Sequence, residues 1–461
     1  MQKGKKCMKT IMKRTLTSLI CLVLCGIMLL SASCTGRSLE PLQTVPENRD
    51  TVEEQTNRPI MPEGIITPTK ELSAEYTRKA WERGQIDLSF RIAMSDFAFD
   101  LFHKTLKEAK PGENQNISPL SAVLCLSLIA NGAEGETLAQ MEAALGMPIS
   151  DLNHRLYTYA QNIVGSNSDD CTVSLGNSVW FWDSPQLTVK PDYLQTVANW
   201  YDAEIFATPF NTQTVNDIND WCGEKTNGKI NQVVDDTDMD NDAVMFLINA
   251  LYFDAVWQDT YEEDQIEPGF FTNQVNSLSR VNMLSSKESV YLSGEGFTGF
   301  TKDYKGGQYS FVALLPDQGK DIDTFAASLT GETWRTLWAA KEDALVDVKI
   351  PEFTFEYNLS LVDALKAMGM TDMFDRHTAD FAAMAKYERF NLYCEEVRQK
   401  TLIELDRKGT KAAAVTVGEM APTAVAPVTP RYSVILNRPF VFAIVDNQTG
   451  LPLFLGIVRK L

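Results

Sequence analysis

Histidine, cysteine and serine side chains carry most enzymatic nucleophile and base chemistry, and this chain offers little of it. Its 461 residues contain three histidines, His103, His154 and His377, each without an evident acidic or nucleophilic partner nearby in sequence. The HExxH, GxSxG and P-loop patterns are absent. Scattered thiols also argue against a Cys/His nucleophile. The sequence therefore predicts a binding protein rather than an enzyme, with no cofactor.

Eight cysteines occur, and their spacing contains no CxxC pair and no metal-ligand pattern, so no metal site is expected. Four of them lie within the first 34 residues. The other four are far apart in the chain, which favours buried free thiols: Cys125, Cys171, Cys222 and Cys394. Because an exported protein can be oxidised, the sequence leaves their redox state open.

The charge of the chain is divided between a basic start and an acidic body. The net charge is −19, and residues 1–33 carry six basic and no acidic side chains, so the rest carries −25. A body this acidic disfavours nucleic acid, heparin-like polyanions and anionic membrane surfaces as partners.

Residues 1–33 read as a signal peptide, because a basic stretch precedes the apolar run "LTSLICLVLCGIMLL". The following "SASC" resembles the lipobox of bacterial lipoproteins, with cleavage before Cys34 and lipidation on it, although Ser31 stands where Leu is usual. A plain secretory signal cut near "SAS", residues 31–33, remains the alternative. The apolar run is shorter than the roughly 20 residues of a membrane span.

Residues 34–85 are rich in Pro, Glu and Thr and poor in aromatic residues, which predicts a flexible tether after the lipidated cysteine. An extension docked on the domain is the alternative. No second Pro-rich linker or repeat appears before residue 420, so residues 86–461 are predicted to form one domain.

The elements of this domain are mixed. Apolar residues at helical spacing predict helices near 92–109, 119–133, 136–146 and 360–369. Continuous apolar stretches predict strands at 173–182, 244–253, 309–316, 345–357, 432–446 and 452–461. Such strands, with helices outside them, indicate a large buried sheet.

The segment "GTKAAAVTVGEMAPTAVAPVTP", residues 409–430, is small, nearly uncharged and placed between two predicted strands. At a period of two, Lys411 and Glu419 share one face, and the face that carries Thr410 is small or apolar throughout. Pro422 cannot occupy the middle of a sheet. The strand-competent run is therefore Gly409–Ala421, spanning roughly 43 Å at 3.3 Å per residue.

Collinear motifs give the chain a resemblance to the serpins over roughly residues 90–461. "NISPLSAVLCLSLIANGAEGET", "NDWCGEKTNGKI", "FLINALYFDAVW", "KIPEFTFEYNLSLVDALKAMGMTDMF", "DRKGTKAAA" and "NRPFVFAIVDNQTGLPLFLGIV" occur in family order. The resemblance implies an α+β serpin fold. It would have a large central β-sheet, further sheets, about eight or nine helices, and an exposed reactive-centre loop near the C-terminus.

The resemblance also implies a function, the suicide-substrate inhibition of serine, and by extension cysteine, endopeptidases. A protease cleaves the exposed loop, which then inserts into the central sheet while the protease is still acylated. Fast insertion needs a small hinge. The matching residues here are Gly409, Thr410, Lys411, Ala412, Ala413, Ala414 and Val415, with Lys411 in place of the usual Glu.

Family spacing from the hinge places the reactive bond at Thr423–Ala424, whereas counting back from "NRPF" places it near Val428. The flanking residues are small and apolar. They suit elastase-like or subtilisin-like proteases, or papain-like enzymes of broad preference.

Two further positions depart from the family. Arg407 replaces a Glu at the base of the loop, which leaves open whether a supporting ion pair is lost or rebuilt. Gln399 replaces a His of the sheet-opening cluster, and Gln can still bridge hydrogen bonds there. The other members implied for the cluster match: Ser118, Ser121, Asn249 and Trp257.

The sequence thus predicts a monomeric protease inhibitor, exported and tethered to a bacterial envelope facing the periplasm or the outside. A non-inhibitory serpin acting as a binding or chaperone-like module remains the alternative.

Overall fold

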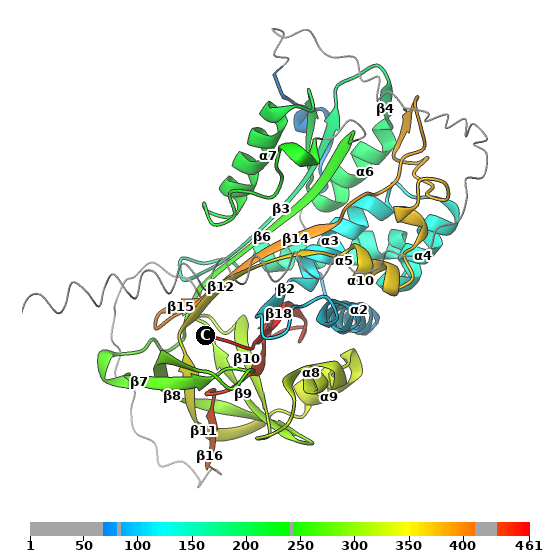
Figure 1. Ribbon diagram of the computed structural model, residues 1–461. Helices are drawn as coiled ribbons and strands as arrows, with labels where there is room; N and C mark the ends of the chain where they lie inside the picture. Colours follow the sequence, from blue (N-terminus) through cyan, green and yellow to red (C-terminus); the bar gives the residue numbers. More distant parts are fainter. Residues whose placement is uncertain (1–67, 81–83, 240–242, 411–430) are drawn as a thin grey trace, which may run out of the picture. The chain divides into compact units, whose positions relative to one another are not determined.

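The computed structural model describes residues 68–80, 84–239, 243–410 and 431–461. Their strands form a seven-stranded sheet, a nine-stranded sheet and a two-stranded ribbon of β4 (Leu187–Val189) and β13 (Ala385–Tyr387) (Figure 1). The described residues also form nine α-helices. The predicted α+β architecture with a large central sheet is confirmed.

The seven-stranded sheet runs in the order β1-β5-β3-β6-β15-β14-β12. Its long central strands are those that the continuous apolar stretches predicted. Their bounds are β1 Lys70–Glu71, β5 Glu204–Thr208, β3 Cys171–Trp182, β6 Met245–Val256, β15 Gly409–Thr410, β14 Arg398–Leu405 and β12 Phe353–Ser360.

The nine-stranded sheet runs β16-β11-β8-β9-β10-β17-β18-β2, with β7 paired to β8. Two apolar stretches predicted as single strands are each two strands, so those predictions were wrong. The first breaks at Glu352, where the chain passes from the nine-stranded to the seven-stranded sheet, and the second breaks before Phe440, where Pro439 cannot donate to a ladder. The bounds are β16 Arg431–Ile435, β11 Glu342–Pro351, β8 Leu278–Gly294, β9 Phe297–Asp303, β10 Tyr309–Pro316, β17 Phe440–Asp446, β18 Pro452–Val458, β2 Gln115–Ile117 and β7 Ile266–Thr272.

Helices cover both faces of the seven-stranded sheet. Helix α3 packs on one face of β6 and α7 packs on the other, because side chains alternate along the strands: Val179 faces the main core, whereas Trp180 faces α7. None of the described helices is long and apolar enough to cross a membrane. The helices are α2 Leu88–Leu106, α3 Pro119–Ala130, α4 Gly135–Leu145, α5 Ile149–Val164, α6 Pro191–Tyr201, α7 Thr212–Lys225, α8 Ile322–Ser328, α9 Gly331–Ala339 and α10 Val362–Ala367.

The end of the segment 34–85, assigned above to a tether, lies on the domain. Lys70–Glu71 pair with β5 as an edge strand, and the amide of Leu72 donates to the carbonyl of Ile205 at 2.7 Å. The ammonium of Lys79 lies 4.3 Å from the ring centre of Trp200, a cation–π contact. The rest of that segment up to residue 67, the signal 1–33 and Cys34 are outside the described residues.

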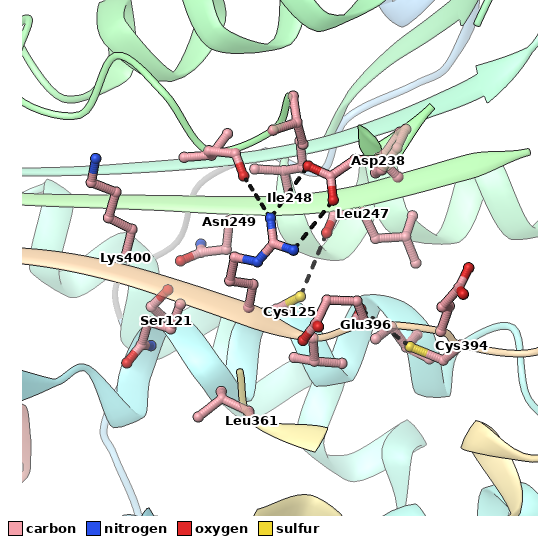
Figure 2. A pocket seen from close by; sticks show the side chains of 18 of the residues that line it. Ser121, Cys125, Asp238, Leu247, Ile248, Asn249, Leu361, Cys394, Glu396 and Lys400 are labelled. Carbon is pink, nitrogen blue, oxygen red and sulfur yellow. Dashed lines mark hydrogen bonds and ion pairs between the residues drawn. The ribbon is translucent and has the colours of Figure 1, made fainter. Parts of the chain in front are cut away.

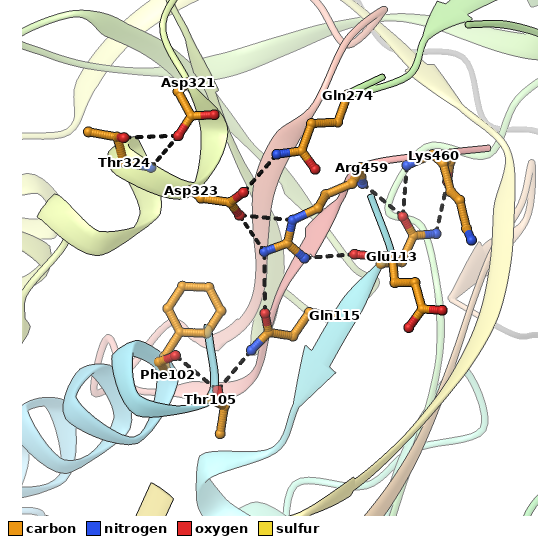
Figure 3. Close-up of polar contacts among 11 residues, drawn as sticks. Phe102, Thr105, Glu113, Gln115, Gln274, Asp321, Asp323, Thr324, Arg459 and Lys460 are labelled. Carbon is orange, nitrogen blue, oxygen red and sulfur yellow. Dashed lines mark hydrogen bonds and ion pairs between the residues drawn. The ribbon is translucent and has the colours of Figure 1, made fainter. Parts of the chain in front are cut away.

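A buried arginine fastens the C-terminal end of the chain (Figure 3). The guanidinium of Arg459, 2% exposed, donates to the carboxylate of Asp323 at 2.6 and 2.9 Å and to the carbonyl of Glu113 at 2.7 Å. A buried charge is tolerable only with such a counterion and hydrogen bonds. This cluster therefore joins the end of β18 to α8 and to the turn before β2.

Candidate functional site

The hinge predicted from the sequence begins inside the seven-stranded sheet. Gly409 pairs with Val256 and Thr410 with Ala255 on β6, while Thr410 pairs with Leu405 on β14. The carboxylate of Asp406 accepts hydrogen bonds from the amides of Lys408 and Gly409, which fixes the turn between β14 and β15. The first two hinge residues thus lie between β6 and β14, as the start of an added strand.

Close packing explains why these two positions need small residues. A Cβ on Gly409 would stand 2.0 Å from the carbonyl oxygen of Ala255, so only glycine fits without movement. Thr410 is 4% exposed, and its hydroxyl is hydrogen-bonded to that of Tyr304. Tyr304 in turn stacks on Trp257, with ring centres 4.5 Å apart. Burial raises the pKa of the Tyr304 phenol, which keeps this floor neutral.

Trp257 has a second role at the hinge. Its indole Nε1–H donates to the carbonyl of Asp406 at 2.9 Å, and its backbone amide donates to the carbonyl of Lys408. The family tryptophan therefore holds the turn that presents the hinge to the sheet.

Beyond Thr410 the two flanking strands separate. Within the described residues, β6 is hydrogen-bonded to β3 along its length on one side and only to the two residues of β15 on the other. A small cavity of about 30 Å³ lies next to Thr410, and one of about 450 Å³ follows between β6 and β14 (Figure 2). Strand edges without ladder partners are templates for another strand, so this gap can accept one.

Two ion pairs cross this gap. The chain between α7 and β6 supplies Lys229 and Asp238, and β14 supplies Glu404 and Arg398. The Nζ of Lys229 lies 2.8 Å from Glu404, and the guanidinium of Arg398 lies 3.2 Å from the carboxylate of Asp238. An incoming strand has to pass beneath or displace these links.

The predicted sheet-opening cluster is divided into two groups. The side-chain amide of Gln399 exchanges two hydrogen bonds of 2.8 Å with the backbone of Ser118. The Ser118 hydroxyl caps α3 by accepting from the amide of Ser121. Asn249 instead turns to β3, where its Nδ2 donates to Asn177 at 2.9 Å. Gln399 therefore joins β14 to the start of α3, and among the described residues it makes no hydrogen bond to Asn249 on β6.

The ion pair at the base of the loop is rebuilt around Arg407. Its guanidinium lies 2.5 Å from Glu263 and 3.7 Å from Glu352, which stands at the start of β12. The acidic partners complement the sign of Arg407, so the departure from the family pattern costs no ion pair. Neither partner was foreseen, because each is far away in sequence and nothing local marks it.

The rest of the predicted loop lies outside the described residues. This applies to the hinge positions Lys411, Ala412, Ala413, Ala414 and Val415 and to the reactive bond Thr423–Ala424.

The four cysteines of the domain are free thiols. Burial raises the pKa of each thiol, for Cys125, Cys171 and Cys222 to about 12. The histidines are distributed over α2, α5 and the loop after α10, and His154 and His377 are exposed. Among the described residues no group of three or more His, Cys, Asp or Glu side chains could hold a metal ion.

Residues 92–461 match the family described as serpin (serine protease inhibitor). The chain belongs to the serpin family. This serpin is 28% identical to the leukocyte elastase inhibitor of Equus caballus over 378 residues, which cover 79% of this chain and 97% of that protein. It is 27% identical to the corticosteroid-binding globulin of Oryctolagus cuniculus over 372 residues, covering 79% and 93%.

A solved structure gives the same assignment. The native state of the thermophilic serpin tengpin superposes with a TM-score of 0.79 at 38% identity, covering 85% of this chain and 100% of that one. Serpins are protease inhibitors, so this serpin is not an enzyme.

Proposed function

We propose that this serpin inhibits endopeptidases as a suicide substrate, through insertion of its cleaved loop between β6 and β14. One observation carries the proposal: Gly409 pairs with β6 and Thr410 pairs with both β6 and β14, at the head of a gap that no other described strand fills. Every further residue that enters can add backbone hydrogen bonds on two sides, which makes insertion downhill once the loop is cut.

The targets are proteases that accept small apolar residues, elastase-like or subtilisin-like enzymes and papain-like enzymes of broad preference. The support is the sequence around Thr423–Ala424 and onward to Val428, together with the elastase inhibitor among the relatives.

The test is incubation of the mature protein with elastase, followed by a denaturing gel. A covalent complex is expected, and the fragment released from it should begin at Ala424. A fragment beginning at Thr429 would move the bond to Val428. Clean cleavage without any complex, with elastase, subtilisin and papain alike, would contradict the proposal and favour the alternative, a non-inhibitory binding or chaperone-like module.

The same chain is proposed to be a monomeric lipoprotein of a bacterial envelope, exported by residues 1–33 and lipidated on Cys34. The support is the basic–apolar signal followed by "SASC". Labelled palmitate should enter the wild-type protein and not the Cys34→Ala variant. Equal labelling of both, or release of the wild type into the medium, would leave the plain secretory signal. Light scattering of the released domain should give the mass of one chain, and a multiple of that mass would contradict the monomer.

A further inference from the structure

The cavity of about 450 Å³ between β6 and β14 has the dimensions and lining of a small-molecule site. Ligand pockets commonly occupy about 300–1,000 Å³ and are mostly apolar with a few placed polar groups. This one is lined by aliphatic and aromatic side chains from α3, β6, the residue before α10 and the chain that leads into β14. They include Ala122, Leu247, Leu361, Phe390 and Leu392.

One buried acceptor in the lining has no partner. The Nδ2 of Asn249 donates to the carbonyl of Gly176 and to Asn177, which fixes the amide so that Oδ1 must point elsewhere. That oxygen is buried and makes no hydrogen bond in the described structure. Buried polar atoms are normally paired, so a donor supplied by a ligand would satisfy it.

Two neighbouring polar side chains already have partners. Both ends of the Gln399 amide bond to the backbone of Ser118, and the Ser118 hydroxyl donates to the carbonyl of Leu453 at 2.8 Å. No described side chain donates to Asn249 Oδ1, so an occupant of the cavity with a donor group would satisfy it.

The charges around the cavity argue against an anionic ligand. Its two cations are engaged, Arg398 with Asp238 and Lys400 with Glu356 at 3.5 Å. The lining also carries Glu395 and Glu396, so acidic groups outnumber basic ones. A carboxylate or phosphate would thus lose its hydration without gaining a free cation.

Two thiols line the middle and far parts of the cavity, where Glu396 also lies. Figure 2 shows Asn249 and Ser121 towards one end and Cys394 towards the other, with Cys125 between them. Buried free thiols behave as small hydrophobic groups. An aliphatic chain would lie along them.

We propose that this cavity binds an uncharged single-chain amphiphile, whose hydroxyl or amide donor bonds Asn249 and whose aliphatic chain lies along Cys125 towards Cys394. Because the cavity lies in the gap beyond β15, its occupant and the residues after Thr410 compete for one space. The bound amphiphile would then turn the inhibitor into a substrate. This second step rests on the function proposed above, whereas binding itself does not.

Binding can be measured by the protection of Cys394 from iodoacetamide in the mature protein, read by peptide mass spectrometry. With 1-decanol at ten times its dissociation constant, labelling of Cys394 should slow about tenfold by mass action, while labelling of Cys171, outside the cavity, stays the same. Decanoate, with the same chain and a charge, should change the rate less than twofold. No slowing by 1-decanol up to its solubility limit, or equal slowing by decanoate, would overturn the proposal.

Two variants locate the site. Cys125→Leu fills the cavity and should abolish the protection of Cys394, whereas the matched Cys171→Ala variant should keep it. Persistent protection in a folded Cys125→Leu protein would place the ligand elsewhere. The wild-type comparison of 1-decanol with decanoate remains decisive if that variant does not fold.

Competition has its own readout. 1-Decanol should raise the number of serpin molecules consumed per elastase inhibited, at the same concentrations that protect Cys394. Protection with unchanged stoichiometry would overturn the competition. A serpin that forms no covalent complex in any condition would refute the proposed inhibitory function, and protection of Cys394 would still decide the ligand site.

Discussion

Replacing Thr410 with arginine tests whether entry of the hinge into the sheet drives inhibition. In the native protein Thr410 is 4% exposed and pairs with β6 and β14, with its hydroxyl on that of Tyr304. An arginine here has no acidic partner in the aromatic floor formed by Tyr304 and Trp257. The charged side chain would therefore leave the sheet and take β15 with it into solvent.

Full insertion of the cut loop would then require burial of that charge. Burying an ion in a protein usually costs several kcal/mol. We take about 3 kcal/mol of this cost as the increase in the activation free energy of insertion. Since each 1.36 kcal/mol is tenfold in rate, insertion should slow about 150-fold. The acylated protease would then be deacylated and released before the loop is inserted.

The assay is titration of elastase with wild-type, Thr410→Ser and Thr410→Arg proteins. The arginine variant should be cleaved and consumed as a substrate with little covalent complex, while the serine variant keeps the hydroxyl and stays an inhibitor. Equal stoichiometry for the arginine and wild-type proteins, with both folded by circular dichroism, would refute the argument.

Three more perturbations follow from the site. Arg407→Glu faces Glu352 with a like charge and should lower the free energy of unfolding by about 1 kcal/mol in urea titration, as for exposed pairs, and Glu352→Lys should restore it. Arg398→Met or Asp238→Asn removes an ion pair across the gap, which should let the uncut loop insert more readily. Inhibitory activity should therefore decay faster on incubation than in the wild type, and an equal rate of decay would show that the ion pair does not restrain insertion. Because burial raises the pKa of the Cys125 thiol to about 12, native labelling of it should rise about tenfold per unit across pH 7–9, and a plateau near pH 9 would contradict this.

The sequence predicted the fold because its signals are local. An apolar run with little charge marks a buried strand, and Ser118 followed by Pro119 marks the start of α3, where the Ser118 side chain accepts from the amide of Ser121. The strand boundaries at Glu352 and Pro439 were missed for a common reason. A continuous apolar run indicates that a segment is buried, but it does not indicate which sheet the segment joins or where one strand ends and the next begins.

The site was less predictable because its contacts join distant segments. The ion pairs of Lys229 with Glu404 and of Arg398 with Asp238 link residues separated by 160 or more positions, and no spacing rule connects them. The unpaired oxygen of Asn249 is likewise a property of geometry, since the same side chain could have met Gln399 instead.

The attachment of β1 has a mechanical consequence. Within residues 68–80, Lys70 and Glu71 pair with the outer edge of the sheet that holds the hinge. Lys79 adds a cation–π contact with Trp200 on α6. Were the chain ahead of them fastened at a surface, any pull on the domain would first load this edge strand. Detachment of residues 68–80 would add 13 residues, roughly 43 Å of extended chain, to the connection between that surface and the domain. Only then would the inner strands of the sheet carry tension.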